Sequence, residues 1–260
     1  MQAVRVMDAL KATLQAIQNK GLERIDAQIL LLHALQKPTN DRAWLVSHDT
    51  DELTPDQQQT LDDLIKRRLA GEPVAYIVGS KEFFGLNLAV NSDVLVPRPD
   101  TEVLVEWALD VLPLSPGGRG QGRGGNVLDL GTGSGAIGLA IKHARPNAEV
   151  TLVDASQASL GVACGNAASL GLMVHGLQSN WFENVPSDSR FDAIVSNPPY
   201  IADGDAHLAA LAHEPMMALT SGVDGLDAIR RIVQDAPCYL KRGGWLLLEH
   251  GYDQAEPVRS

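Results

Sequence analysis

The sequence predicts an α/β fold, in which a parallel sheet is covered by helices on both faces and follows a small helical bundle. From Asn126 onward, β-prone runs alternate with helical patterns, which is typical of such a sheet. Residues 1–70 carry helical patterns alone, and a short β-prone region connects the two parts. The β-prone runs of the sheet are 126–130, 149–153, 173–178, 191–196 and 244–249, and the helical patterns between them are 135–144, 156–170 and 224–240.

The N-terminal part is predicted to form four helices. Apolar residues recur at intervals of three or four in the first two, and Trp44 and Leu45 lie in the third. Thr54-Pro55-Asp56-Gln57 is typical of a capping box with proline in the first turn, and it starts the fourth. These helices are expected at 4–17, at 22–35, within 39–48 and from 54 to about 69. We expect a bundle whose role, packing or substrate docking, the residues alone leave open.

A β-hairpin within 71–96 is expected to link this bundle to the main domain. Its β-prone runs are 76–78, 83–84 and 86–90, separated by Gly79 and Gly85. A further helix follows, with Asp100 as its expected cap. Residues 113–125 are rich in glycine and are predicted to form a flexible surface loop without chemistry.

Composition limits the classes of function. A length of 260 residues with 45% hydrophobic content allows one good-sized domain and a smaller one. No run approaches the ~20 apolar residues of a membrane span, so we expect a cytoplasmic protein. We also expect the protein to be a monomer. The two cysteines and seven histidines lack metal-ligand spacing, so no metal is expected. The net charge of -11 argues against broad binding to nucleic acid and favours protein or small-molecule partners.

A glycine-rich turn follows the first strand of the predicted sheet. It reads Gly131-Thr132-Gly133-Ser134-Gly135, and 133–138 match the G-x-G-x-x-G pattern of nucleotide-binding loops. That pattern alone also fits a dinucleotide dehydrogenase. Asp129 decides between the two, because a carboxylate there repels a pyrophosphate and attracts the ammonium of an amino-acid moiety. S-adenosylmethionine has such a group and no phosphate, and it is the predicted cofactor.

Two further strand ends supply predicted cofactor contacts. Asp154 follows the glycine turn at close to the ~20-residue spacing at which an acidic side chain meets ribose hydroxyls. The alternative for Asp154 is a surface acid after a strand. Asn180 and Trp181 end the third strand, where a polar group and a ring are suited to bracket adenine. Taken alone, Trp181 would be interpreted as a core residue.

The strand at 191–196 stops at Asn197-Pro198-Pro199-Tyr200. The two prolines end the strand and stiffen the loop, because they lack a backbone N–H and fix φ. The Asn197 side-chain carbonyl and the Pro198 backbone carbonyl can each accept a hydrogen bond, and Tyr200 offers a flat ring. The four residues are therefore predicted to grip one planar, neutral NH2 group. The alternative, a simple turn after a core strand, is what two prolines alone would predict.

On these residues, the chain resembles the release-factor glutamine methyltransferases, which methylate the glutamine side-chain amide in the Gly-Gly-Gln motif of peptide chain release factors. Residues 71–251 match this family closely, and the first helical part matches it in layout. The matching motifs are Gly71-Glu72-Pro73, Tyr76 to Gly79, Glu82 to Phe84, Val96 to Glu102, the glycine turn, Asn197 to Tyr200, and Glu214-Pro215 with Gly222 to Leu226.

The resemblance implies a Rossmann-like, S-adenosylmethionine-dependent methyltransferase domain at 97–260, a hairpin linker at 71–96 and a substrate-docking bundle at 1–70. It also implies that the glycine turn, Asp154, Trp181 and Asn197 touch the cofactor, and that 197–200 hold the target glutamine.

The sequence departs from the family at two places. Asn180 stands where the family commonly has aspartate, which implies a weaker adenine contact. The sequence also ends shortly after 244–249, whereas methyltransferases of this fold add a C-terminal strand pair. With that pair missing, we expect an unpaired sheet edge along 244–249 and reduced stability.

Two rival functions stay open on the residues alone. An N6-adenine methyltransferase of DNA or RNA would present the same planar NH2 group by base flipping. The acidic balance and the missing basic target-recognition domain count against it. A non-catalytic scaffold that binds S-adenosylmethionine is the other rival, and the intact Asn197 to Tyr200 motif argues against it.

Overall fold

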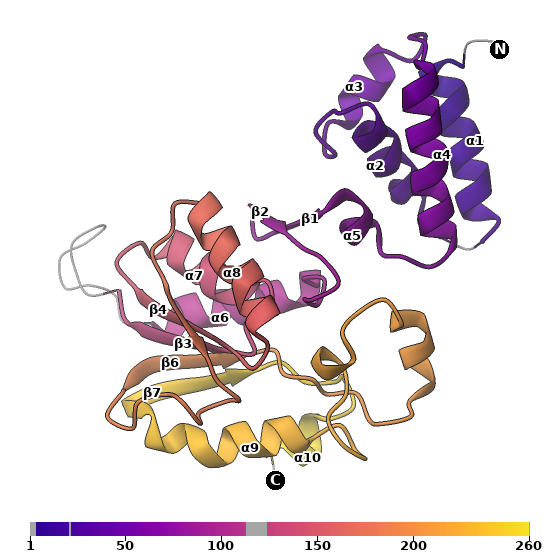
Figure 1. Cartoon of the computed structure of the whole chain (residues 1–260). Coiled ribbons are helices and arrows are strands. Elements are labelled where there is room, and N and C mark those ends of the chain that lie inside the picture. Colours follow the sequence, from indigo (N-terminus) through magenta and orange to yellow (C-terminus); the bar gives the residue numbers. More distant parts are fainter. Residues whose placement is uncertain (1–3, 21, 113–123, 260) are drawn as a thin grey trace. The chain divides into compact units, whose positions relative to one another are not determined.

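The computed structural model describes residues 4–20, 22–112 and 124–259, and the chain divides into two compact units, Met1–Gly79 and Ser80–Ser260. Figure 1 labels the helices and strands of each unit. Of the described helices, none has the length and apolar character needed to cross a membrane.

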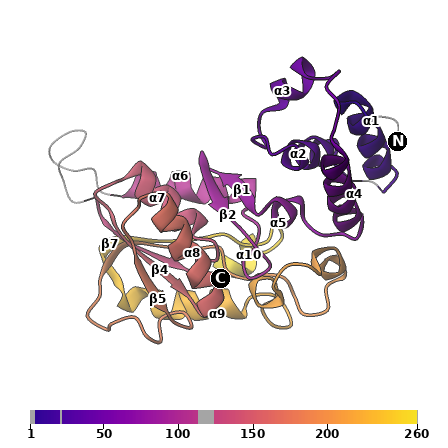
Figure 2. The ribbon, with the colours of Figure 1, turned by 45° about the horizontal axis from the view of Figure 1, so that its top comes forward.

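The first unit is a helical bundle. Helices α1, α2 and α4 lie side by side and share an apolar core that includes Ile17, Leu30 and Leu61 (Figures 1 and 2). The bundle helices are α1 (Val6–Gln18), α2 (Arg24–Ala34), α3 (Arg42–Ser47) and α4 (Pro55–Leu69). The capping box is present at α4, because the Gln57 N–H donates to Thr54 Oγ1 over 3.2 Å and the Thr54 N–H donates to Gln57 Oε1 over 2.9 Å. All four predicted helices are therefore confirmed.

The segment after α4 corrects one prediction. The β-prone run 76–78 belongs to a helix, α5 (Val74–Val78), which starts after Pro73 and ends at Gly79 with a φ of 77°. Ile77 is buried in the bundle core, and α5 packs against α2 and α4. The composition of this segment favours a strand, but a residue's intrinsic preference is weak and burial against two helices outweighs it.

The second unit begins with the expected hairpin, formed by β1 (Ser80–Phe83) and β2 (Leu86–Ala89). Helix α6 (Glu102–Val111) follows a 3-10 turn, η1 (Pro99–Thr101). Asp100 lies inside that turn and does not cap α6, which contradicts the prediction, because Thr101 occupies the cap position. Residues 113–123 of the predicted glycine-rich loop lie outside the described residues.

Five parallel strands form the sheet of the second unit, in the order β5-β4-β3-β6-β7. The strands are β3 (Asn126–Leu130), β4 (Glu149–Asp154), β5 (His175–Gln178), β6 (Phe191–Ser196) and β7 (Leu240–Leu248). The chain runs outward from β3 to β5 and then returns to β6 on the other side of β3. Ligands of such sheets bind beyond the carboxyl ends of the strands at this reversal.

Helices cover both faces of the sheet, as predicted. Helices α6, α7 (Ala136–Ala144) and α8 (Gln157–Ser169) lie on one face, and α9 (Asp227–Asp235) lies on the other (Figure 1). Strand β3 shows the alternation, since Val127 belongs to the core under α6 to α8 while Leu128 and Leu130 belong to the core that includes Ile232 of α9. Helix α9 is shorter than the predicted 224–240, because Pro237 in the following turn, η4 (Ala236–Cys238), cannot continue an α-helix.

The last sheet strand lies at an edge. In the part of the chain that the structure describes, β6 alone pairs with β7, and Trp245 on β7 is 52% exposed. The expected unpaired edge at 244–249 is therefore present. Two 3-10 turns, η2 (Ala206–Leu211) and η3 (Met216–Ala218), lie in the long connection between β6 and α9, and α10 (Ala255–Arg259) follows β7.

Candidate functional site

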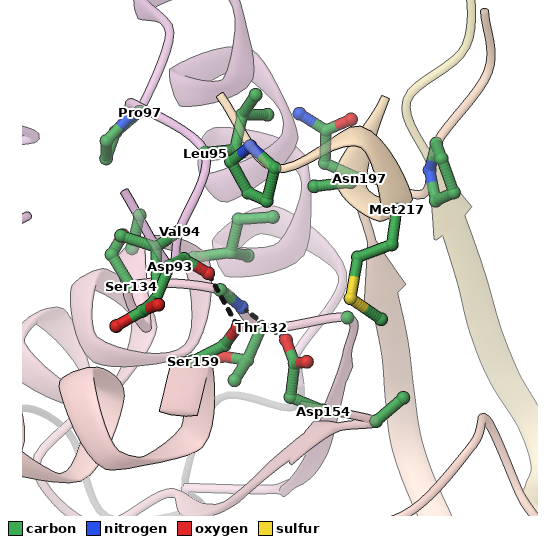
Figure 3. A pocket seen from close by; sticks show the side chains of 18 of the residues that line it. Asp93, Val94, Leu95, Pro97, Thr132, Ser134, Asp154, Ser159, Asn197 and Met217 are labelled. Carbon is green, nitrogen blue, oxygen red and sulfur yellow. Dashed lines mark hydrogen bonds between the residues drawn. The ribbon is translucent and has the colours of Figure 1, made fainter. Parts of the chain in front are cut away.

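A cavity of about 210 Å³ opens at the carboxyl ends of β3, β4 and β6 (Figure 3). It lies at the reversal of strand order, the place that the fold favours for a ligand. Most predicted site residues line it: Gly131, Thr132, Gly133, Ser134, Asp154, Asn180, Trp181, Asn197 and Pro199. Asp129, Gly135, Pro198 and Tyr200 are not among its lining residues.

The glycine turn needs its glycines for two different reasons. Gly133 and Gly135 adopt φ angles of 55° and 85°, which side chains rarely tolerate. Gly138 lies in α7, where an added Cβ would come within 2.4 Å of Leu152 Cδ2 on β4. Gly133 and Gly135 therefore shape the turn, and Gly138 lets α7 approach the sheet closely.

Asp129 holds this turn from behind the cavity wall. Its side chain is 0% exposed, and Oδ2 accepts hydrogen bonds from Thr132 Oγ1 at 2.7 Å and from the Gly138 N–H at 2.9 Å. The other oxygen, Oδ1, is buried and has no hydrogen-bond partner among the described residues. Desolvation on burial raises the pKa of Asp129 to about 6, although Thr132 and Gly138 oppose the shift.

Asp154 also supports the turn. Its Oδ2 accepts from the Gly133 N–H at 2.9 Å, and its Oδ1 accepts from the Ser156 N–H at 2.9 Å. Burial raises the pKa of Asp154, while these two backbone donors lower it. Asp154 is therefore a half-buried group with structural partners, and it differs from the alternative interpretation as a surface acid.

The hydrogen bonds of the turn disfavour a phosphate ligand. A phosphate-binding loop leaves several backbone N–H groups free to face the anion. Here the N–H groups of Thr132, Gly133 and Gly135 donate to Val153 O, Asp154 Oδ2 and Thr132 O respectively. With a carboxylate also on the wall, the site suits a cofactor that carries an ammonium and hydroxyl groups, and S-adenosylmethionine fits this donor and acceptor set.

Trp181 and Asn180 form another part of the wall. Trp181 has a φ of 53°, and its ring lies 3.5 Å from the position that a Cβ on Gly131 would occupy. The ring therefore lies against the first glycine of the turn, where a planar base can stack. Asn180 Nδ2 donates to Glu183 Oε1 at 2.8 Å, so its amide nitrogen is engaged within the protein.

The Asn197 to Tyr200 loop is held at both ends. Ser196 Oγ donates to Leu130 O at 2.7 Å, which fastens the end of β6 to the end of β3. Asn197 Nδ2 donates to Thr101 Oγ1 at 3.2 Å, and the Tyr200 hydroxyl donates to Glu249 Oε1 at 3.3 Å. Burial, followed by the charge of Glu249, raises the pKa of Tyr200, so the phenol is a hydrogen-bond donor near neutral pH.

Sequence reasoning missed several residues of the cavity. Arg98 lines it and pairs with Glu214, whose side chain is 3% exposed and which also accepts from the Val96 N–H at 3.1 Å. Met217 lines it from η3 (Figure 3). Arg98 and Glu214 lie in motifs shared with the family, which was the available signal, but neither residue was assigned to the site from the sequence. No local pattern indicated Met217.

A buried amide links the glycine turn to the hairpin. Asn166 on α8 donates through Nδ2 to Ala89 O at 3.0 Å and to Ser134 O at 2.8 Å. Its Oδ1 accepts from the Ala89 N–H at 2.7 Å. Asn166 thus joins β2 to the wall of the cavity, and nothing in the sequence pattern indicated this role.

Two family models match the chain. The model described as Methyltransferase small domain matches residues 114–222, and the model described as PrmC N-terminal domain matches residues 8–79. The first match contains the glycine turn, Asp154 and the Asn197 to Tyr200 loop. The second corresponds to the helical unit.

Curated relatives match nearly the whole chain. A release factor glutamine methyltransferase of Bordetella pertussis is 49% identical over 247 residues, which cover 94% of this chain and 87% of the relative. Proteins of the same description from Coxiella burnetii and Xylella fastidiosa are 48% and 46% identical, covering 90% and 95% of this chain and 81% and 87% of the relatives.

Solved structures of methyltransferases share the fold over part of the chain. A T. thermophilus 16S rRNA N2 G1207 methyltransferase in complex with AdoMet and guanosine matches with a TM-score of 0.51 at 28% identity, covering 69% of this chain and 43% of that chain. The hMettl16 catalytic domain in complex with MAT2A 3'UTR hairpin 1 matches with a TM-score of 0.55 at 15% identity, covering 76% of this chain and 70% of that chain. At that identity the second likeness shows the fold alone.

Proposed function

Because the chain belongs to the release factor glutamine methyltransferases, we propose that it transfers the methyl group of S-adenosylmethionine to a glutamine in peptide chain release factors. The acceptor is the side-chain amide nitrogen of the glutamine in their Gly-Gly-Gln motif. The observation that carries this proposal is one shared cavity, in which Asn197 and Pro199 lie with the glycine turn and Asp154.

We propose that the ribose, the adenine and the ammonium group of the cofactor each have a matching side chain on the cavity wall or behind it. Asp154 would accept from the ribose hydroxyls, and Trp181 would stack on adenine beside Asn180. The charge of Asp129 behind the turn would favour the ammonium group. Bound S-adenosylmethionine supplies an electrophilic methyl group, and the protein's task is to present the amide nitrogen to it.

An amide nitrogen is a poor nucleophile, because its lone pair is delocalised into the carbonyl. We propose that the Asn197 side-chain oxygen and the Pro198 carbonyl accept the two N–H hydrogens of the glutamine amide. This would favour a pyramidal nitrogen whose lone pair faces the methyl group. Tyr200 would pack against the flat amide. As the N–CH3 bond forms, the S–CH3 bond breaks, neutral S-adenosylhomocysteine leaves, and the methylated amide releases one N–H proton to solvent. The half-buried loop also limits water, which favours dispersal of the cofactor's positive charge during the transfer.

The two units would divide the work. We propose that the N-terminal bundle docks the release factor, that residues 71–96 join the parts and that 97–260 carry the methyl transfer. The match of the PrmC N-terminal domain model to 8–79 supports a family-specific role for the first unit. Because the proposed substrates act in translation, we also place the enzyme in the cytoplasm.

The proposal is tested by incubating the protein with labelled S-adenosylmethionine and a purified release factor, and in parallel with DNA and RNA. We expect label on the Gly-Gly-Gln peptide after digestion and mass spectrometry. The matched control is a release factor whose motif glutamine is replaced by glutamate, which has no amide to methylate. Label on nucleic acid instead would favour the adenine methyltransferase, and cofactor binding without any transfer would favour the scaffold.

A further inference from the structure

A chain of hydrogen bonds connects the Asn197 to Tyr200 loop to the end of β7. Thr101 Oγ1 donates to Glu249 Oε2 at 2.7 Å and accepts from Asn197 Nδ2 at 3.2 Å. The other carboxylate oxygen of Glu249 accepts from the Tyr200 hydroxyl at 3.3 Å. Both polar side chains of the loop therefore lead to one carboxylate.

Backbone contacts fix this carboxylate in place. The Glu249 N–H donates to Ser196 O at 3.0 Å, so Glu249 extends the pairing of β7 with β6 right up to Asn197. Thr101 comes from the start of α6 and is 5% exposed. Three separate parts of the chain thus meet at the wall of the cavity, which Thr101 and Asn197 both line, whereas Glu249 is not among the lining residues (Figure 3).

The hydrogen bonds of this chain can run in only one direction. A carboxylate has acceptors and no donor, so the single hydrogen of the Thr101 hydroxyl goes to Glu249. Thr101 Oγ1 can then only accept a further hydrogen bond, and it accepts one from the amide nitrogen of Asn197. If the Asn197 amide were reversed, its oxygen would face the Thr101 oxygen without a hydrogen between them, which is unfavourable for buried groups.

We propose that Glu249 and Thr101 are positioning residues, which orient the Asn197 amide so that its oxygen faces the NH2 group of the substrate. This inference rests on the proposed function and adds two residues to it. Neither residue needs to touch the substrate for this role. Glu249 sets the hydrogen-bond direction, Thr101 transmits it, and Asn197 presents an acceptor where a reversed amide would present a donor.

Glu249→Gln is the sharpest test, because it keeps the size of the side chain and reverses the direction of the hydrogen bonds through Thr101. The introduced amide can donate to Thr101 Oγ1 and still accept from the Tyr200 hydroxyl. The Thr101 hydrogen is then free for the Asn197 oxygen, which turns the Asn197 nitrogen toward the substrate. Every group stays paired, so we expect an unchanged unfolding midpoint and S-adenosylmethionine affinity with kcat at least about tenfold lower, the scale of one lost hydrogen bond.

Thr101→Val and Thr101→Ser provide the second arm. Valine removes the hydroxyl, so no hydrogen bond then fixes which end of the Asn197 amide faces the substrate, and kcat should fall. Serine keeps a hydroxyl, so kcat of Thr101→Ser should be near the wild-type value. A readout independent of turnover is the calorimetric affinity of a release factor for the protein loaded with S-adenosylhomocysteine, which we expect to weaken severalfold in Glu249→Gln and Thr101→Val.

Glu102→Gln is the matched control. It neutralises a half-buried carboxylate next to Thr101 that accepts from the Phe84 N–H at 3.0 Å, and it should leave kcat unchanged. Wild-type rates and affinities in both Glu249→Gln and Thr101→Val would overturn the positioning role, because simple packing predicts that an isosteric change is harmless. A wild-type protein that does not methylate release factors would instead overturn the proposed function, so the two failures are distinguishable.

Discussion

Replacing Asp129 by asparagine should stabilise the protein at pH 7. The carboxylate is completely buried, and its pKa is raised from 3.8 to about 6, mainly by desolvation. That difference corresponds to about 3 kcal/mol of unfavourable charging free energy near neutral pH. Asparagine keeps an acceptor for Thr132 and Gly138, but its nitrogen has no partner at the position of Oδ1, which costs about 1–2 kcal/mol. The expected net gain is about 1–2 kcal/mol.

The pH dependence gives this prediction its direction. Because the folded pKa of Asp129 is raised, the folded state binds more protons than the unfolded state between pH 3.8 and about 6. The contribution of Asp129 to stability therefore decreases as pH rises through that window and is constant above it. Denaturant unfolding of both proteins at pH 4, 5, 6 and 7 measures the difference, in which all other titrating groups cancel. The advantage of Asp129→Asn should grow up to about pH 6 and then level off.

An equal loss of stability at every pH would refute this reasoning, since it would mean that the hydrogen bonds of Asp129 outweigh its desolvation. A second readout is cofactor affinity. An ammonium near Asp129 favours the ionised carboxylate, so wild-type binding of S-adenosylmethionine should tighten as pH rises through about 6. The asparagine variant should bind more weakly and lose that pH dependence, which calorimetry can measure.

Substitutions at three further positions test the cavity wall and its support. Asp154→Ala removes the proposed acceptor of the ribose hydroxyls, so it should weaken S-adenosylmethionine binding by about 2–4 kcal/mol. Because Asp154 also accepts from two backbone N–H groups, the substitution should lower the unfolding midpoint. Unchanged calorimetric affinity would remove Asp154 from the site. Asn197→Ala should slow single-turnover methyl transfer at least ~10²-fold with a much smaller effect on cofactor affinity, and Asn197→Asp should retain more activity than alanine; wild-type rates in both would mean that the loop is only a turn. Asn166→Ala removes the three hydrogen bonds by which Asn166 joins β2 to the glycine turn, and it should cost about 2–4 kcal/mol of stability. An unchanged denaturation midpoint would contradict this expectation.

The features that could be predicted from the sequence have local signals. Four of the described sheet strands, β3, β4, β6 and β7, contain a short apolar run, so their positions follow from the residues themselves. The glycine turn and the Asn197 to Tyr200 loop lie directly after such runs, and strand ends in a parallel sheet meet at one edge. Sequence spacing alone therefore brought Asp154, Trp181 and Asn197 to the same cavity.

The features that escaped prediction depend on distant contacts. Thr101 and Glu249 are hydrogen-bonded across 148 positions of the chain, and no spacing rule connects them. Helix α5 was mistaken for a strand because its residues favour one, whereas burial of Ile77 against two other helices decides the outcome. The sequence placed Asp129 near the cofactor loop but gave no information on the direction of its carboxylate, which turns to Gly138 and Thr132 behind the cavity.

Under the proposed function, the carboxylates would also explain how a glycine turn of nucleotide-binding type selects a cofactor without phosphate. Asp154 occupies the N–H of Gly133, and Asp129 occupies the N–H of Gly138, two donors within the G-x-G-x-x-G pattern. A phosphate would have to displace these acceptors and approach two negative charges at once. The ammonium group of a cofactor is attracted by the same two negative charges. The raised pKa of Asp129 is then the energetic consequence of keeping a carboxylate in a position without water. If Asp129→Asn stabilises the protein but binds S-adenosylmethionine less well, the carboxylate lowers the stability of the fold and raises its affinity for this cofactor.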